Sequence, residues 1–272
     1  MNAPQAALLP DRRRLHLNHG PIDLIVEVFG TDPAEPYMRA ARRFETVLCG
    51  LVGELDALRG RLGEVEFADP IARRMADAVR PFDRFVTPMA AVAGAVADAV
   101  LSAMVEGQDI PKAYVNNGGD IAFHLGPGQS FNSFGVAGEI RIQADDTVRG
   151  LATSGWRGRS HSLGIADAVT VLADSAAAAD VAATLIANAV DLPRHPAIAR
   201  ARACDLSPDS DLGGRLVTTD VGPLTQAETC AALARGQAVA KRFRARGLIQ
   251  QAILSLNDRH IHAAAEEALI HA

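Results

Sequence analysis

Ala168-Val-Thr-Val-Leu-Ala-Asp-Ser-Ala-Ala-Ala-Ala-Asp-Val-Ala-Ala-Thr184 joins a predicted buried strand, over residues 168–172, to an alanine-rich helix that Ser175 can cap. Asp180 and Thr184 are four residues apart in that helix and therefore lie on one face. A carboxylate and a hydroxyl so placed can hold Mg²⁺ or Ca²⁺ if backbone carbonyls and water complete the shell. The alternative is structural, because helix starts favour Asp and a Thr hydroxyl can bond a carbonyl of the preceding turn.

A second polar stretch, Asn116-Asn117-Gly118-Gly119-Asp120, ends a strand expected over residues 112–116. Paired glycines let a ligand come close to the backbone and its N–H groups. The flanking Asn and Asp side chains offer amide donors and a carboxylate acceptor, which suit a ring edge or sugar hydroxyls. The candidate ligand-binding residues here are Asn117, Gly118, Gly119 and Asp120. The alternative is a plain hairpin turn into a strand over 121–125, because Asn-Gly is the favoured type I′ pair.

Thr153-Ser154-Gly155-Trp156 follows another expected strand, over residues 149–153. Small hydroxyl residues before a glycine occur at phosphate and carbonyl contacts, and they are equally common in loops. Trp156 is the only tryptophan and lies beside Arg157 and Arg159. An indole can stack on a heteroaromatic ring, and arginine can pair with phosphate or carboxylate. The second group of candidate ligand-binding residues is therefore Thr153, Ser154, Gly155 and Trp156, with a lid or interface tryptophan as the alternative.

His161, between that loop and the strand at 168–172, is the candidate catalytic residue, as a general acid or base. No cysteine or carboxylate adjoins it in sequence, so the pattern predicts no triad, and a polar loop histidine is the alternative. His260-Ile261-His262 resembles a metal clamp, but we interpret it as a strand with one polar face. Neither a P-loop pattern nor a Rossmann glycine fingerprint occurs, which disfavours those nucleotide-binding folds.

The rest of the chain predicts strand pairs and helices in irregular succession. Alternating residues predict a hairpin over 11–30, and residues 193–224, rich in Pro, Asp, Gly and Ser, predict a short helix and a loop. Helices are expected over residues 36–60, 70–80, 88–105 and 225–246, and further strands over 138–143 and 248–256. The lack of regular βαβ alternation favours an α+β fold with antiparallel sheet.

Composition excludes some partners. Of the 272 residues 49% are hydrophobic but only 4% aromatic, so Ala, Val, Leu and Ile must build the core. A net charge of −5 gives no electrostatic attraction to nucleic acid. A membrane span needs about 18 uninterrupted apolar residues. Residues 89–105 come nearest, but Asp98 interrupts them, so we expect no membrane association.

The three cysteines are Cys49, Cys204 and Cys230. Their odd number and wide separation predict reduced, mostly packed thiols in a cytoplasmic protein, not a disulfide framework. Cys49 lies in an apolar helical run and is expected in the core. Residues 1–10 contain no signal-peptide pattern, which agrees with the cytoplasmic expectation.

Taken in order, these segments resemble the ApbE superfamily, best known for its FAD:protein FMN transferases. The matching features are a small-residue helix, a strand before Gly-Gly-Asp, Ala-Thr-Ser-Gly, a histidine, a Val-Thr-Val strand and Asp-x-x-x-Thr. They lie at residues 88–100, 115–121, 152–155, 161, 169–171 and 180–184, within a match over 85–190. The resemblance implies an α+β core of the T-fold type, with two halves packed as one domain over 1–272.

The resemblance also implies site roles. The Gly-Gly-Asp loop of the transferases helps to hold a flavin nucleotide, which assigns that role to residues 117–120. Asp180 and Thr184 match the Mg²⁺ or Ca²⁺ ligands, and a backbone carbonyl near Ala93 completes that set. The expected cofactors are FAD or FMN with Mg²⁺ or Ca²⁺, and the expected partner is a small-molecule ligand. T-fold proteins usually assemble, so a homo-oligomer is expected.

Two departures separate this chain from the transferase pattern. The Ala-Lys-Gly-Tyr of the transferases is replaced by residues 90–96, which lack Lys and Tyr, and the segment after His161 lacks Pro and Thr-Gly. The pattern is similar to an uncharacterised cytosolic branch with relatives in methanogens and methylotrophic or related bacteria. We expect a protein that binds a flavin- or pterin-type heteroaromatic ligand, as a cation-dependent transferase or hydrolase. The alternative is a non-catalytic ligand-binding or scaffold protein without FMN transfer.

Overall fold

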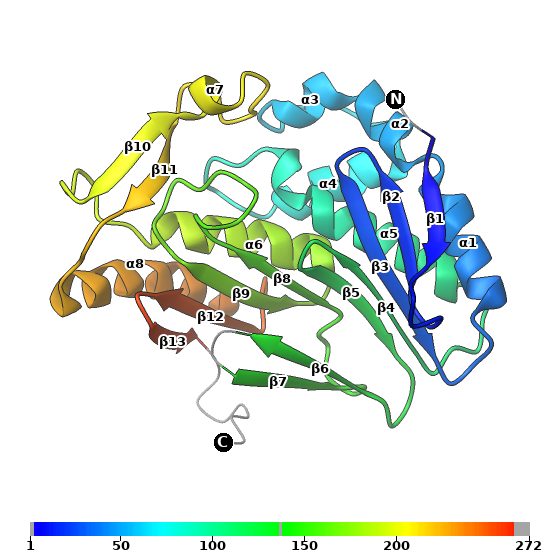
Figure 1. Ribbon diagram of the computed structural model, residues 1–272. Coiled ribbons are helices and arrows are strands. Elements are labelled where there is room, and N and C mark those ends of the chain that lie inside the picture. The colour runs from blue at the N-terminus through cyan, green and yellow to red at the C-terminus, as the bar shows by residue number, and fades with distance from the viewer. Residues whose placement is uncertain (1–2, 136–137, 264–272) are drawn as a thin grey trace.

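The computed structural model describes residues 3–135 and 138–263, and one antiparallel sheet of nine strands forms its centre (Figure 1). All neighbouring strand pairs in this sheet are antiparallel. In spatial order the strands are β1 (Gln5–Leu8), β2 (Leu15–His19), β3 (Ile22–Phe29), β4 (Lys112–Asn117), β5 (Asp120–Leu125), β8 (Gly150–Ser154), β9 (Ala168–Ala173), β12 (Gln251–Leu256) and β13 (Arg259–Ala263). The fold class is α+β, which confirms the sequence-based expectation.

Helices cover one face of the sheet (Figure 1). The helices of the described residues are α1 (Ala34–Phe44), α2 (Val47–Gly53), α3 (Leu55–Arg59), α4 (Pro70–Val79), α5 (Val92–Val105), α6 (Ala176–Ala189), α7 (Ala203–Leu206) and α8 (Gln226–Ala245), with a 3₁₀ turn η1 (Pro88–Ala91) before α5; α7 lies beside β10 and not on the sheet. Helix α5 packs on β4 and β5, α6 packs on β8 and β9, and α8 packs on β12 and β13. The main core therefore lies between these three long helices and the sheet.

Side-chain alternation assigns the two faces of the sheet. In β9, Val169 and Val171 are fully buried in the main core, whereas Leu172 belongs to a second apolar cluster. A hairpin of β6 (Ser130–Gly135) and β7 (Gly138–Gln143) supplies part of that cluster. Its Phe131 ring stacks on Phe123 of β5, with centroids 4.7 Å apart. This hairpin therefore covers part of the sheet face that the long helices leave open.

The segment Pro88–Val105 is long and apolar enough to cross a membrane, but 61% of it is buried inside the fold. Its one acidic residue, Asp98, is also buried and accepts hydrogen bonds from the start of α6. The segment thus has the surroundings of a core helix.

The hairpins over β2–β3 and β4–β5 and the helices α4, α6 and α8 lie where the sequence predicts them. The single helix expected over 36–60 is instead three helices, α1 to α3. Glu54, between α2 and α3, accepts hydrogen bonds from the backbone N–H of Ala68 at 3.0 Å and of Asp69 at 2.6 Å. These bonds to a distant segment hold the chain at the break, and local periodicity does not encode them.

The sequence predicts a short helix and a loop over the segment 193–224. The segment contains α7 together with a two-stranded hairpin of β10 (Ile198–Arg202) and β11 (Leu216–Val221). No residue of β10 is fully buried, so this strand lacks the apolar alternation by which strands are recognised.

The expectation of a core position for Cys49 is wrong, because its side chain is exposed. The buried residues of α2 are Val47, Leu48 and Leu51, and Cys49 lies on the other side of the helix. Cys230 is also exposed and Cys204 is partly buried, so the thiols are not mostly packed.

Candidate ligand-binding site

The first turn of α6, the helix that carries Asp180, is capped by two side chains. Ser175 caps the helix as the sequence predicts, its hydroxyl accepting from Ala178 N at 3.2 Å. Asp98, from the middle of α5, completes the cap by accepting from Ala176 N at 3.1 Å and from Ala177 N at 3.0 Å. The first amides of α6 are therefore satisfied by side chains, which is why a carboxylate can be buried in an otherwise apolar helix.

Asp180 makes the reverse interaction, from α6 to the first turn of α5. Its Oδ2 accepts from Gly94 N at 3.1 Å. The approach depends on glycine, because a Cβ on Gly94 would lie 2.2 Å from the Ala176 carbonyl oxygen. Burial, and next the charge of Asp120, raise the pKa of Asp180 well above its ordinary value, against the opposing effect of the nearby backbone N–H groups. The side chain of Asp180 is only partly buried, so a ligand can reach it.

The β4–β5 turn approaches this helix start from the sheet. Asn117 is buried, and its side-chain amide donates to the carbonyl of Ala93 at 3.1 Å. Gly118 and Gly119 form the two-residue turn with φ of +66° and +111°, values that favour glycine. The Gly119 N–H donates to Asn116 Oδ1 at 2.8 Å, so this amide is already used inside the turn. The turn and the start of α5 are thus joined directly.

Asp120, immediately after the turn, brings a second carboxylate to the same region. Its Oδ1 accepts from Thr153 N at 3.2 Å, which links β5 to the end of β8. Burial raises the pKa of Asp120 to about 7, although the Thr153 hydrogen bond and the charge of Arg159 act in the opposite direction. Asp120 and Asp180 therefore form a pair of partly buried acids from segments far apart in the chain, close enough for the charge of one to affect the other.

The segment Thr153-Ser154-Gly155 leads out of β8. The Thr153 hydroxyl lies 2.9 Å from the Thr170 hydroxyl on the neighbouring strand β9. Gly155 is buried against the start of β9, where a Cβ would lie 2.3 Å from the Asp167 carbonyl oxygen. Ser154 is partly exposed beside them. This tight strand exit fixes where the following loop begins.

Trp156 lies at the base of the loop between β8 and β9. Its backbone N–H donates to the Ala166 carbonyl at 3.0 Å, and its indole Nε1 donates to Asp167 at 3.3 Å. Arg157 also pairs with Asp167, at 2.8 Å, and its guanidinium lies 4.5 Å from the centre of the indole ring. Asp167 thus holds both Trp156 and Arg157 at the base of the loop, and the indole lies against the Arg157–Asp167 ion pair.

His161 is on the far side of the same loop. Its Nε2 lies 3.2 Å from the hydroxyl of Ser207, which follows α7. In the part of the chain that the structure describes, His161 makes no hydrogen bond to Asp120 or Asp180. The structure therefore joins the glycine turn to the start of α5, and joins His161 to the segment after α7.

The oxygen donors around Asp180 fit a hard divalent cation. Two neighbouring acids with raised pKa values are stabilised as carboxylates when a cation shares them. Thr184 lies one turn further along α6 and is half-buried. The Ala93 carbonyl, in the first turn of α5, accepts from the Asn117 side chain at 3.1 Å in addition to its place in the helix hydrogen-bond pattern. No group of three acidic, His or Cys side chains suited to a metal occurs among the described residues, so carbonyl, hydroxyl and water oxygens would complete the shell.

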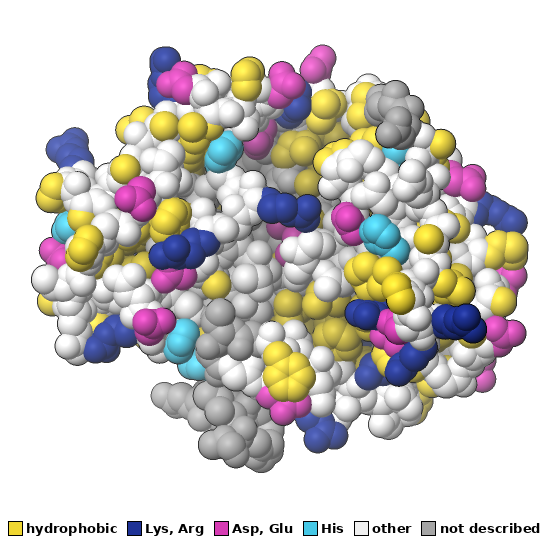
Figure 2. All heavy atoms as spheres, viewed as in Figure 1, with side chains coloured by type: hydrophobic (Ala, Val, Ile, Leu, Met, Phe, Trp, Pro, Cys, Tyr) yellow, Lys and Arg dark blue, Asp and Glu magenta, His cyan; other side chains and the backbone are white. Residues whose placement is uncertain are grey.

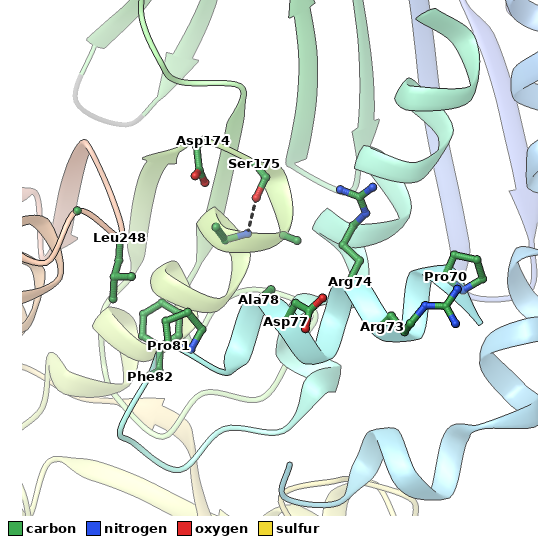
Figure 3. Close-up of a pocket in the computed structure, with 13 residues that line it drawn as sticks. Pro70, Arg73, Arg74, Asp77, Ala78, Pro81, Phe82, Asp174, Ser175 and Leu248 are labelled. Carbon is green, nitrogen blue, oxygen red and sulfur yellow. Dashed lines mark hydrogen bonds between the residues drawn. The ribbon is translucent and has the colours of Figure 1, made fainter. Parts of the chain in front are cut away.

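On the face shown in Figure 2 the molecule is hollowed below the upper helices, with basic and acidic side chains beside the hollow. A separate pocket of about 590 Å³ lies between α4 and the start of α6. Figure 3 shows Arg73 and Arg74 on α4 and the bond from Ser175 to the first turn of α6. Because Asp98 and Ser175 already satisfy those helix amides, we do not assign the ligand site to this pocket.

Two features of the site escape the sequence analysis. The sequence shows Asp98 only as an interruption of an apolar run, but the structure makes it the cap of α6. Arg159 lies with its guanidinium against the glycine turn, where a Cβ on Gly118 would be 2.1 Å from Arg159 Nη2. A charged residue inside an apolar helix was the available signal for Asp98, whereas the contact of Arg159 depends on the loop path.

A family model described as AbpE bacteria matches residues 6–263 of the chain. A UPF0280 protein of Methanopyrus kandleri is 36% identical over 129 residues, which are 46% of this chain and 51% of that protein. A UPF0280 protein of Methanothrix thermoacetophila is 40% identical over 133 residues, 46% of this chain and 54% of that protein. The chain thus covers about half the length of these two relatives.

A mutant of flavin transferase ApbE from Vibrio cholerae has a similar structure, with a TM-score of 0.50 at 14% sequence identity. The superposition covers 93% of this chain and 98% of that one. At this identity the likeness shows the fold alone.

Proposed function

The chain belongs to the AbpE bacteria family, within the ApbE-like superfamily, and from this premise we propose that it binds a flavin- or pterin-type heteroaromatic ligand beside Asp120 and Asp180. The observation that carries the proposal is geometric: Asp180 accepts from Gly94 N at the start of α5, and Asn117 of the β4–β5 turn, which Asp120 follows, donates to the adjacent Ala93 carbonyl. The similarity to a flavin transferase supports the choice of ligand class.

The same proposal includes a divalent cation, Mg²⁺ or Ca²⁺. Asp120, Asp180 and Thr184 would hold it, together with the carbonyl of Ala93. When bound, such a cation neutralises charge on a phosphate or diphosphate group. The residues of the glycine turn, 117–120, and the segment 153–156 would position the ligand. Trp156 would contact its ring if the indole leaves Asp167, to which it is bonded at 3.3 Å.

In the enzymatic form of the proposal, the protein is a transferase or hydrolase, and His161 acts as the general acid or base that transfers a proton to or from the reacting group. The non-catalytic alternative is favoured by one observation: His161 bonds to Ser207 and makes no hydrogen bond to either acid among the described residues. Incubation with FAD, Mg²⁺ and candidate acceptor peptides separates the two forms. AMP released by the unsubstituted protein and lost in both Asp180→Asn and His161→Ala supports an enzyme, and no release from the unsubstituted protein supports the alternative.

Ligand binding is tested by titrating the protein with FAD, FMN and a pterin while the fluorescence of Trp156 is followed. We expect quenching with micromolar affinity, the ordinary range for small-ligand enzymes. Binding of the phosphorylated ligands should strengthen with Mg²⁺, and Asp180→Asn should abolish that dependence. Asp56→Asn, at an exposed position of α3, is the matched control that should retain it. Absence of binding for all three ligands, measured also by calorimetry, would count against the proposal.

A cytoplasmic homo-oligomer is also part of the proposal. The three free cysteines support a reducing compartment. Leu8 on the edge strand β1 and Leu216 on β11 are 57% and 55% exposed, which suits contact with another copy. Light scattering coupled to gel filtration tests the assembly, and a monomeric mass at micromolar concentration would contradict it.

A further inference from the structure

Arg159 occupies the space that the missing side chain of Gly118 leaves. A Cβ there would lie 2.1 Å from Nη2 and 3.3 Å from Cζ of Arg159. The guanidinium therefore lies directly against the β4–β5 turn, although the two residues come from different parts of the chain. Gly118 has a φ of +66° and is exposed, so the contact is at the surface of the site, not in the core.

The loop that carries Arg159 is held firmly at its base. Trp156 N donates to the Ala166 carbonyl at 3.0 Å, and Gly158 N donates to the Gly155 carbonyl at 3.1 Å. The side chain of Arg157 is ion-paired with Asp167 at 2.8 Å. These contacts direct the following residues of the loop back across the glycine turn.

Arg157 and Arg159 differ in their partners. Arg157 pairs with Asp167 and stacks on Trp156. Arg159 is exposed and, within the described part of the chain, makes neither an ion pair nor a hydrogen bond. It is still near enough to Asp120 for its charge to lower the pKa of that carboxyl. The guanidinium thus has its donors free at the edge of an acidic site.

The carboxylates of Asp120 and Asp180 repel a phosphate group, and the proposed cation and the Arg159 guanidinium are the positive groups that would offset this repulsion. Arginine is suited to this role, because its planar fork of N–H donors matches the oxygens of a phosphate. We propose that Arg159 binds the phosphate of the ligand and makes the site selective for the phosphorylated form of a flavin-type ligand over the form without phosphate. This inference rests on the proposed function and adds a specificity-determining residue to it.

The test compares riboflavin, FMN and inorganic pyrophosphate by calorimetry, for the unsubstituted protein, Arg159→Gln and Arg159→Lys. Arg159→Gln should weaken FMN binding by about tenfold to a hundredfold, the usual range for a lost hydrogen bond to a charged group. Riboflavin affinity should stay within about twofold, because riboflavin has no phosphate for this side chain to contact. Arg159→Lys keeps the positive charge but loses the planar pair of N–H donors, so its FMN affinity should lie between those of the unsubstituted protein and Arg159→Gln. Arg141→Gln, an exposed arginine on β7, is the matched control and should change none of the affinities.

A second variant tests the contact itself. Gly118→Ala should displace the guanidinium and weaken FMN binding, but it should add little further loss when combined with Arg159→Gln. Equal losses of FMN affinity from Gly118→Ala in both backgrounds would show that the loss comes from the turn and not from Arg159, and would overturn the contact.

The outcomes separate this inference from the proposed function. If the unsubstituted protein binds FMN and Arg159→Gln binds it equally well, or loses riboflavin and FMN affinity alike, the role of Arg159 is wrong and flavin binding stands. If neither flavin binds, the flavin form of the proposed function fails, and pyrophosphate then decides whether Arg159 binds phosphate. Binding of pyrophosphate that Arg159→Gln abolishes supports a phosphate site, and absence of pyrophosphate binding overturns it.

Discussion

Asp98 and Asp180 cap each other's helices. Asp98 of α5 accepts from the N–H groups of Ala176 and Ala177 at the start of α6, and Asp180 of α6 accepts from Gly94 N at the start of α5. The interaction places Asp98 in the core with both oxygens used. Asp180 is only partly buried and lies at the edge of the helix pair. The same arrangement therefore stabilises the helix pair and presents a carboxylate to the site.

Removing Asp98 should destabilise the fold. In Asp98→Ala the buried N–H groups of Ala176 and Ala177 lose their acceptors, and we expect a loss of about 2–3 kcal/mol in the free energy of unfolding. Ser175→Ala removes one cap bond, to Ala178 N, and should lose about 1 kcal/mol. Urea denaturation followed by circular dichroism measures both. A loss below about 0.5 kcal/mol for Asp98→Ala would show that the reciprocal cap contributes little.

Gly94→Ala should disturb the same helix pair by overpacking. The new Cβ would lie 2.2 Å from the Ala176 carbonyl oxygen, and backbone must move to relieve this contact. We expect a loss of about 2 kcal/mol or more in unfolding free energy. Gly53→Ala, at the end of α2 with no atom within 4 Å of the new Cβ, is the control and should be neutral or stabilising by up to about 1 kcal/mol. Equal effects of the two substitutions would contradict the close approach of α5 and α6.

Local sequence patterns predict much of this fold. The β4–β5 hairpin follows from alternation before Gly118-Gly119, and the start of α6 follows from Ser175. What they miss depends on distant partners. The break after α2 rests on Glu54 bonding to residues 68 and 69, and β10 is too exposed to show alternation. Both features thus depend on tertiary packing between distant segments, and a short stretch of sequence carries no information about such contacts.

The candidate site shows the same division. The sequence predicts that Asp180 and Thr184 lie one turn apart on a single helix, and both residues are in α6 of the structure. Asp120 is the acid whose charge affects Asp180. The two residues are brought near each other by the packing of α6 on β8 and by the position of the β4–β5 turn. Likewise, the partner of His161 is Ser207, a residue from a segment whose strands the sequence analysis does not recognise. The sequence therefore predicts what chemistry each site residue can perform, but only the folded structure shows which residues lie next to it.

Asp120 should make the cation-free protein less stable as pH rises. Its pKa is raised from 3.8 to about 7 in the folded protein, so the folded state holds a proton that the unfolded state has released between these values. The contribution is fully favourable below the unfolded pKa and is lost as pH rises through about 7. Asp180, whose pKa is also raised, acts in the same direction. In EDTA, we expect the Tm of the unsubstituted protein to fall from pH 5 to pH 8 relative to the Tm of Asp120→Asn. A constant difference between the two proteins over this range would contradict the assignment.

Adding Mg²⁺ or Ca²⁺ should reverse that loss of stability, because a cation binds the carboxylate forms of Asp120 and Asp180 and competes with their protons. A ligand that binds only the folded state at about a hundredfold excess over its Kd stabilises by about 2.7 kcal/mol. The Tm increase should therefore be larger at pH 8 than at pH 5, and it should be lost in Asp120→Asn and in Asp180→Asn. Asp56→Asn should respond like the unsubstituted protein. A cation-induced increase that is the same at both pH values, or that survives in the two site variants, would place the cation elsewhere on the protein.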